Sequence, residues 1–260
     1  MDHLLKLDWA RRHTEALQEE FRVFRESKPY LGSLKYNVEE NCYICRAKNI
    51  VPFPVELSLI VGDIVHALRS ALDALVYRLS VNGLGRMPGR GEIQFVQFPI
   101  LDRSNQWAGE RGRALKFLCP GAVEIIESFQ PYNRVDPGKF DALSILRDLA
   151  NIDKHRHILT GIAATSETVL KLEAPAMFPG TEVKGYVGPI MEGQVLAKWR
   201  FDDVPPPPQF DPKFDLKIDL ALEIQISGGE GSTEVSAIPY LRGMVGFLAE
   251  EVFPQFDPFL

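Results

Sequence analysis

The spacing of apolar residues divides this chain into a helical first part and a β-rich second part. In the first part, apolar residues recur about every 3.6 positions with Arg, Glu and Gln between them, which predicts amphipathic helices. A further amphipathic helix is expected near the C-terminus. The predicted helices cover about 4–28, 54–80, 122–130, 140–158 and 238–253.

The two longest predicted helices indicate which side chains should form the core. The stripe expected to be buried in the first helix consists of Leu5, Trp9, Ala16, Phe21 and Phe24. The second helix has an apolar arc opposite a polar side. Its members are Val61, Ile64, Leu68, Leu72, Leu75 and Leu79.

The second part of the chain is rich in Val, Ile, Leu and Thr, with turn-forming residues between the runs. The run 217–227 alternates polar and apolar residues, which is typical of a half-buried antiparallel strand. Earlier in the chain, 34–38 and 42–50 predict a β-hairpin, and 93–100 predicts a short strand or extended stretch. The strands predicted after residue 160 cover 162–174, 182–187, 194–201 and 214–227.

These elements predict an α+β fold. A helical bundle of about four helices is joined to a small antiparallel β-sheet, and the C-terminal helix packs back against the bundle. Residues 1–160 are expected to form a mainly helical core with a β-hairpin near 33–50. Residues 161–260 form the antiparallel β region with the last helix, and the two parts are expected to make one compact unit.

Composition favours a water-soluble protein. The chain has 260 residues, of which 45% are hydrophobic, and no apolar run reaches the roughly 18 residues of a membrane-spanning helix. Acids and arginines interrupt the first residues where a signal peptide would be apolar, so a cytoplasmic location without a membrane partner is expected. The net charge is −6, and no block of Lys and Arg forms a DNA-binding motif.

The cysteines do not predict a metal centre. Cys42 and Cys45 have the spacing of half a zinc site, but no second Cys or His pair follows at ligand spacing. The predicted strand would also send the two thiols to opposite faces. We therefore expect structural cysteines, no cofactor and no bound metal.

One polar stripe on the second helix carries candidate chemistry. His66, Arg69, Asp73 and Tyr77 are spaced i, i+3, i+7 and i+11, so they share one side of the helix. Arg69 and Asp73 can hold each other in place, and a carboxylate can orient a histidine ring. A solvated polar face is the alternative, although such faces usually carry Lys and Glu.

The run from Arg147 to His157, R-D-L-A-N-I-D-K-H-R-H, is the second candidate. Asp153 falls among leucines on the helical wheel, and burying a carboxylate requires a cationic partner, which we expect to be Arg69. The alternative is an ion-pair network that only fixes the packing of the helices. The polar third of the wheel is formed by Arg147, Asn151, Lys154 and His155.

Several motifs resemble a family of uncharacterised bacterial and actinophage proteins with the pattern GDxxHxLRSALD…NIDKHR. The resemblance covers about residues 54–160 and implies no particular activity. It rests on G-D-I-V-H-A-L-R-S-A-L-D-A-L-V-Y at 62–77, Q-F-P-I at 97–100, F-Q-P-Y at 129–132 and N-I-D-K-H-R at 151–156.

The late helix also resembles HEPN domains, helical bundles many of which are ribonucleases of defence and toxin systems. Their signature is an Arg and a polar residue with a His four to six positions further. Here Arg147 lies further than that from His155, and Asn151 has the right helical phase but is not an Arg. The resemblance implies RNA as a partner and a homodimer, for which the apolar C-terminal helix could supply an interface.

The expected function is that of an HEPN-like, metal-independent ribonuclease. A histidine would act as general acid and base, and cations would stabilise the charge on phosphorus. The predicted catalytic residues are His155, His66, Arg69, Arg147 and Lys154. The predicted orienting or ion-pairing residues are Asp73, Asp153, Asn151, Arg156 and Tyr77.

Two alternatives remain open. The first is a non-catalytic protein, either a structural one with a buried charge network or one that binds an anion among Arg69, Lys154 and Arg156. The second is a metal-dependent hydrolase with a site between two helices, although the chain lacks an i,i+4 histidine pair. The ligands of that site would be His66, Asp73, Asp153 and His155.

Overall fold

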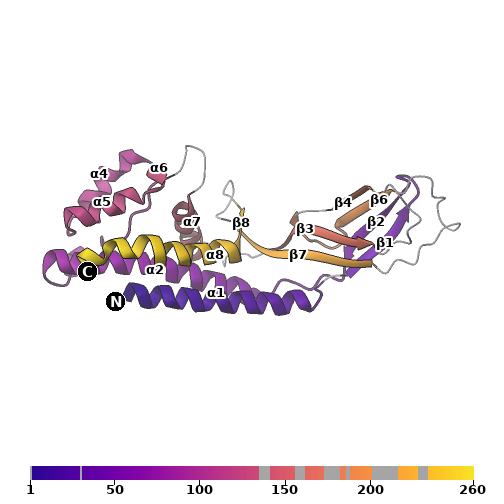
Figure 1. Cartoon of the computed structure of the whole chain (residues 1–260), viewed down its shortest axis with the longest axis horizontal. Helices are drawn as coiled ribbons and strands as arrows, with labels where there is room; N and C mark the ends of the chain where they lie inside the picture. Colours follow the sequence, from indigo (N-terminus) through magenta and orange to yellow (C-terminus); the bar gives the residue numbers. More distant parts are fainter. Residues whose placement is uncertain are drawn as a thin grey trace. The chain divides into compact units, whose positions relative to one another are not determined.

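The chain has the predicted α+β architecture, with helices in the majority and antiparallel sheets (Figure 1). The structure, a computed structural model, describes most of the chain. The described residues are 2–29, 31–134, 141–155, 162–172, 182–185, 188–200, 216–227 and 234–260.

Two compact units make up the chain. The helical unit comprises residues 1–19, 55–160 and 226–260, and the sheet unit comprises 20–54 and 161–225. The chain therefore passes between the units several times.

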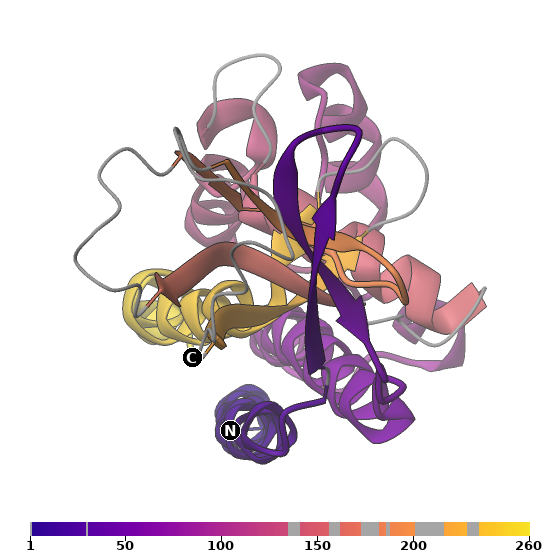
Figure 2. The same cartoon turned by 90° about the vertical axis from the view of Figure 1, so that its right-hand side faces the viewer.

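The helical unit contains two long helices and several shorter ones (Figure 2). One helix, α1, continues from this unit into the start of the sheet unit. The elements are α1 (Asp2–Glu26), α2 (Val55–Leu84), α3 (Arg90–Ile93), the 3-10 turn η1 (Ser104–Gln106), α4 (Trp107–Arg113), α5 (Pro120–Ser128), α6 (Pro131–Arg134), α7 (Ala142–His155), the short strand β8 (Glu234–Ser236), α8 (Ala237–Gly246), the π-helical turn η2 (Phe247–Val252) and the 3-10 segment η3 (Phe253–Phe259).

Helix α2 forms the centre of the helical unit, because α7, α8 and η3 all contact it. The six aliphatic residues predicted for its core arc are all buried. Residues outside that arc, such as Val65, Ala71 and Val76, are buried as well. Burial on most sides explains why this helix carries so few long charged side chains.

Helix α1 buries a different stripe from the predicted one. Its buried positions recur in alternating steps of four and three residues, which is the spacing of a helix that packs on one side. We call this buried row the seam of α1. Leu5 and Trp9, predicted to face the core, lie outside this seam and are exposed. The seam residues are His3, Leu7, Ala10, Thr14, Leu17, Phe21 and Phe24.

The C-terminal helix is shorter than predicted and changes geometry. Regular α-helix ends at Gly246, and Pro254 lies in the first turn of the following 3-10 segment, where its missing N–H cannot continue an α-helical ladder. Its apolar residues are buried within the chain itself. They include Leu241, Met244, Val245, Leu248, Val252, Phe253 and Phe256.

Two glycines of α2 allow close approaches of other segments. A Cβ at Gly62 would lie 2.8 Å from Oδ1 of Asp153, and a Cβ at Gly83 would lie 1.9 Å from the backbone oxygen of Phe117. The second contact is with main chain, which cannot rotate away as a side chain can. Gly83 therefore fixes how closely the segment before α5 approaches the end of α2.

The sheet unit contains two antiparallel sheets. The hairpin of β1 (Leu31–Asn37) and β2 (Cys42–Lys48) is confirmed and continues into β6 (Val195–Arg200) and β4 (Glu182–Gly185). In the second sheet, β3 (Ile162–Leu172) pairs with β7 (Leu216–Ser227) along nearly its whole length, and with the short β5 (Gly188–Pro189).

The stretch 93–100 contains no strand. Helix α3 ends at Ile93, and the residues that follow run without a β-ladder partner in the part of the chain that the structure describes. Phe98, Pro99 and Ile100 are nevertheless buried. We call residues 97–102 the clamped segment, because side chains rather than a neighbouring strand hold its backbone.

The close approach at Gly83 predicts that any side chain at this position destabilises the protein. Gly83→Ala should lower the free energy of unfolding by about 2–3 kcal/mol, because a backbone segment must move to admit the methyl group. Urea denaturation of the purified protein measures this. The matched control is Gly112→Ala in α4, whose Cβ would meet open space and which should be neutral or slightly stabilising. Equal effects of the two substitutions would contradict the packing described.

His3 predicts a pH dependence of stability. Its ring packs edge-on against Phe253 with 5.1 Å between centroids, and its Nδ1 has no hydrogen-bond partner among the described residues. Burial lowers the pKa of His3 from 6.5. The unfolded chain therefore binds the proton first, and stability falls as pH decreases below about 6.5. Between about pH 7 and pH 5, the melting temperature should fall less for His3→Leu than for the wild type. His13→Leu, a change outside the seam, should show the same decrease in melting temperature as the wild type.

Candidate functional site

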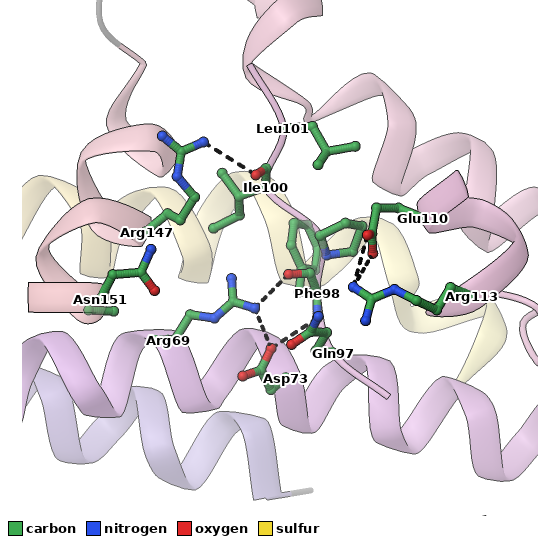
Figure 3. Close-up of a pocket in the computed structure, with 12 residues that line it drawn as sticks. Arg69, Asp73, Gln97, Phe98, Ile100, Leu101, Glu110, Arg113, Arg147 and Asn151 are labelled. Atoms are coloured by element: carbon green, nitrogen blue, oxygen red, sulfur yellow. Dashed lines mark hydrogen bonds and ion pairs between the residues drawn. The ribbon is translucent and has the colours of Figure 1, made fainter. Parts of the chain in front are cut away.

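The helical unit has a polar pocket of about 270 Å³ between α2, the clamped segment, α4 and α7 (Figure 3). It brings together residues that are far apart in the sequence. Its walls are formed by Arg69, Asp73, Gln97, Phe98, Pro99, Ile100, Leu101, Glu110, Arg113, Arg147, Ala150 and Asn151.

Arg69 is the most enclosed cation of the pocket, with a side chain only 12% exposed. Its Nη2 donates to Oδ1 of Asp73 at 2.8 Å and to the backbone oxygen of Phe98 at 2.6 Å. The same Asp73 oxygen accepts the N–H of Phe98 at 2.9 Å. The predicted i,i+4 pair therefore exists, and it also holds both polar backbone groups of Phe98.

The other side of the Arg69 guanidinium is open to the pocket. Among the described residues, none forms a hydrogen bond with its Nε or Nη1. Figure 3 shows the second terminal nitrogen turned into the space that Arg147, Asn151 and Ile100 surround. A guanidinium held on one side and free on the other is arranged to donate to an anion, because its planar fork fits carboxylates and phosphates.

Arg147 has more negative charge around it than Arg69. Its Nη1 lies 2.7 Å from Oδ2 of Asp102, and its Nη2 lies 2.8 Å from Oδ1 of Asp148. Burial lowers the pKa of Arg147, but the hydrogen bonds that it donates to the two carboxylates outweigh this effect, so the pKa is raised. With two carboxylate partners, this arginine has little charge left to offer a ligand.

The clamped segment is also held by Gln130 and Arg147. Gln130 is fully buried, and its amide nitrogen donates to the backbone oxygen of Pro99 at 2.9 Å. Its amide oxygen accepts the N–H of Leu101 at 3.0 Å. Nη1 of Arg147 donates to the backbone oxygen of Ile100 at 3.4 Å. These bonds satisfy buried main-chain groups that no strand satisfies.

Helix α4 closes the remaining side of the pocket with an ion pair. Nη2 of Arg113 lies 2.8 Å from both carboxylate oxygens of Glu110, which is three residues earlier in the same helix. Asn151 of α7 is exposed on the opposite wall. Its amide adds a neutral donor and acceptor beside the free side of Arg69.

The expected ion pair between Arg69 and Asp153 is wrong. Within the described residues, Arg69 pairs with Asp73 instead, and Asp153 lies against Gly62 where α7 crosses α2. The carboxylate is half-buried rather than enclosed by leucines, so it does not require a buried cation.

Of the remaining predicted site residues, His66 and Tyr77 do not line the pocket. His66 is exposed, with Nε2 lying 3.4 Å from the Ser70 hydroxyl, and Tyr77 is half-buried on α2. Helix α7 reaches His155, but the side chains of Lys154 and His155 lie outside what the structure describes. Arg156 lies outside the described residues altogether.

The described residues can also be searched for metal ligands and for reactive thiols. They contain no group of three or more His, Cys, Asp or Glu that could hold a metal ion. Cys42 and Cys45 are both buried on β2, and burial raises the pKa of Cys45 to about 11, which keeps it a thiol. No helix in the described ranges is long and apolar enough to cross a membrane.

Several residues that line the pocket or hold its walls were not predicted as functional. Glu110 and Arg113 belong to a short helix whose spacing gave no signal, and Asp102 follows a proline-containing stretch. Gln130 and Gln97 were visible only as members of the F-Q-P-Y and Q-F-P-I motifs. Their position beside the clamped segment and the pocket is visible only in the structure.

Comparison with known proteins gives no family for this chain, since no family model, curated protein or solved structure matches it significantly. Function must therefore be argued from the pocket itself.

The double role of Asp73 predicts a large effect on stability. Asp73→Ala should lower the free energy of unfolding by about 2–3 kcal/mol, because it leaves Arg69 and the N–H of Phe98 without their acceptor. Chemical denaturation measures this loss. The control is Asp8→Ala, which removes an exposed i,i+4 pair with Arg12 and should change stability by less than about 1 kcal/mol. A similar small effect at Asp73 would show that the clamp is unimportant.

Proposed function

We propose that the polar pocket binds a phosphate group of RNA and that the protein is an HEPN-like, metal-independent ribonuclease. The observation that carries the proposal is the guanidinium of Arg69, which is fixed by Asp73 and Phe98 on one side and open to the pocket on the other. A cation fixed in this way needs little reorganisation when it binds an anion, which favours both affinity and charge stabilisation.

The surrounding charges assign different roles to the two arginines. Arg69 has one carboxylate partner, Asp73, and the rest of its guanidinium faces the pocket, so it would contact the phosphate. Arg147 is neutralised by Asp102 and Asp148, so it would position the clamped segment rather than bind the ligand. Asn151 would add a hydrogen bond to a non-bridging oxygen or to the ribose.

His155 would supply the proton transfer. It follows Asn151 by four residues on α7, which is about one helical turn along the same side. In the proposed reaction a base removes the 2′-hydroxyl proton, the 2′-oxygen attacks phosphorus, and the bond to the 5′-oxygen breaks as that oxygen gains a proton. The products are a 2′,3′-cyclic phosphate and a 5′-hydroxyl, and no metal or external reactant is needed.

A non-catalytic role is the second candidate, and one observation favours it. Arg147 and Arg113, like Arg69, each have a carboxylate partner within the helical unit. Such a network can serve only to hold the clamped segment and the helices around it. In that case the pocket binds an anionic ligand without cleaving it, or binds none.

An RNA cleavage assay tests the ribonuclease proposal. The full chain, treated with EDTA, should cut a labelled single-stranded RNA, and His155→Ala should lower the rate by about 100-fold or more without changing the melting temperature. Arg69→Gln should weaken both binding and cleavage. Arg78→Gln, a change of an exposed arginine on the same helix, should leave both unchanged.

The other outcomes separate the candidates. If the RNA stays intact but binds in a way that depends on Arg69, the protein binds RNA without cleaving it. If the folded protein neither binds nor cleaves RNA, the charged network has a structural role only. Cleavage that EDTA abolishes would contradict a metal-independent mechanism.

A further inference from the structure

A second cavity of the helical unit, of about 460 Å³, lies between α4, the residues that follow it and α5. Its volume is within the range of small-molecule sites. We call it the apolar pocket, because most of its wall comes from apolar side chains. They include Trp107, Leu115, Leu118, Pro120 and Val123. Such a wall favours an occupant with an apolar body, which leaves water when it enters.

Gly112 keeps part of the apolar pocket empty. It belongs to α4 and lines the pocket, and a Cβ at this position would meet open space. Glycine weakens a helix, so helix propensity does not favour it here. A larger side chain at this position would extend into the cavity. Gly109 of the same helix also has open space at its Cβ, but it does not line the pocket.

Two exposed cations also line the apolar pocket, whereas no carboxylate does so among the described residues. Arg111 of α4 has no ion-pair partner in the ranges that the structure describes. Lys116 lies over the ring of Phe117, with 4.8 Å between Nζ and the centroid, which orients the ammonium without neutralising it. The carboxylate of Glu92 is within electrostatic reach of Lys116, but both of its oxygens accept hydrogen bonds from Arg86. The pocket therefore combines an apolar wall with uncompensated positive charge.

We propose that the apolar pocket binds a small organic anion with an apolar body, of the kind of a medium-chain monocarboxylate. The apolar body would lie against Trp107, Leu115 and Val123, and the carboxylate would lie at Arg111 and Lys116. The planar guanidinium can donate to both carboxylate oxygens, and the positive charge favours an anion over a neutral molecule of the same shape. This site is separate from the polar pocket and does not depend on the function proposed for it.

Calorimetric titration of the full chain with octanoate tests the site. Gly112→Leu should weaken octanoate binding about tenfold or more, because the new side chain fills the space of the apolar body. The matched control is Gly109→Leu on the same helix, which should leave the affinity unchanged. Both variants should melt at or slightly above the wild-type temperature, since leucine favours a helix more than glycine does. A wild type that does not bind octanoate, or equal losses of affinity in the two variants, would overturn the proposal.

A second pair of titrations tests the role of the charges without filling the cavity. The double variant Arg111→Gln, Lys116→Gln should bind octanoate about tenfold more weakly than the wild type, because two exposed charge pairs are lost. It should bind 1-octanol, which has the same chain length but no charge, as well as the wild type does. Added salt should weaken octanoate binding by the wild type more than by the double variant. A double variant that keeps its affinity for octanoate, or loses both ligands equally, would rule out recognition of the anion by these cations.

Discussion

The stability of the helical unit depends on hydrogen bonds to the buried backbone groups of the clamped segment, which has no neighbouring strand. Unpaired main-chain groups in a protein interior are costly, and most proteins pair them in a helix or sheet. Here Asp73 and Arg69 hold Phe98, and Gln130 holds Pro99 and Leu101. Side chains of α2 and of the turn between α5 and α6 thus replace a β-ladder, and they join these elements through the clamped segment.

The same arrangement produces the pocket. Because Arg69 uses only one nitrogen in the clamp, the rest of its guanidinium remains on the surface of a cavity that α7 and α4 complete. Asp102 connects the clamped segment to α7 through Arg147 and through the Ser144 hydroxyl. Structural and ligand-binding roles therefore overlap in these residues, and removing one of them changes both. Asn151 makes no hydrogen bond to the clamped segment among the described residues, so its variants separate ligand binding from stability better than variants of the arginines.

Close packing gives α2 a second kind of constraint. Gly62 admits the Asp153 carboxylate at the crossing with α7, and Gly83 admits the backbone of Phe117 near the end of the helix. Both are conformationally ordinary positions at which the absence of a side chain matters. They show why a helix that is buried on most sides keeps two glycines despite their low helix propensity.

The sequence by itself determined the element types, because the 3.6-residue and two-residue apolar periods are local properties of the chain. It located the long helices, the hairpin of β1 and β2, and the pairing of Arg69 with Asp73, whose spacing of four brings them together in any helix. It did not determine which side of α1 is buried, since Leu5 and Trp9 are as apolar as the residues of the true seam. Nor did it show that Gln130 and Arg113 lie around the clamped segment, or that Asp102 within that segment pairs with Arg147. Those contacts join residues distant in the chain, and only tertiary packing decides which buried polar groups need a partner and which side chains are near enough to provide it.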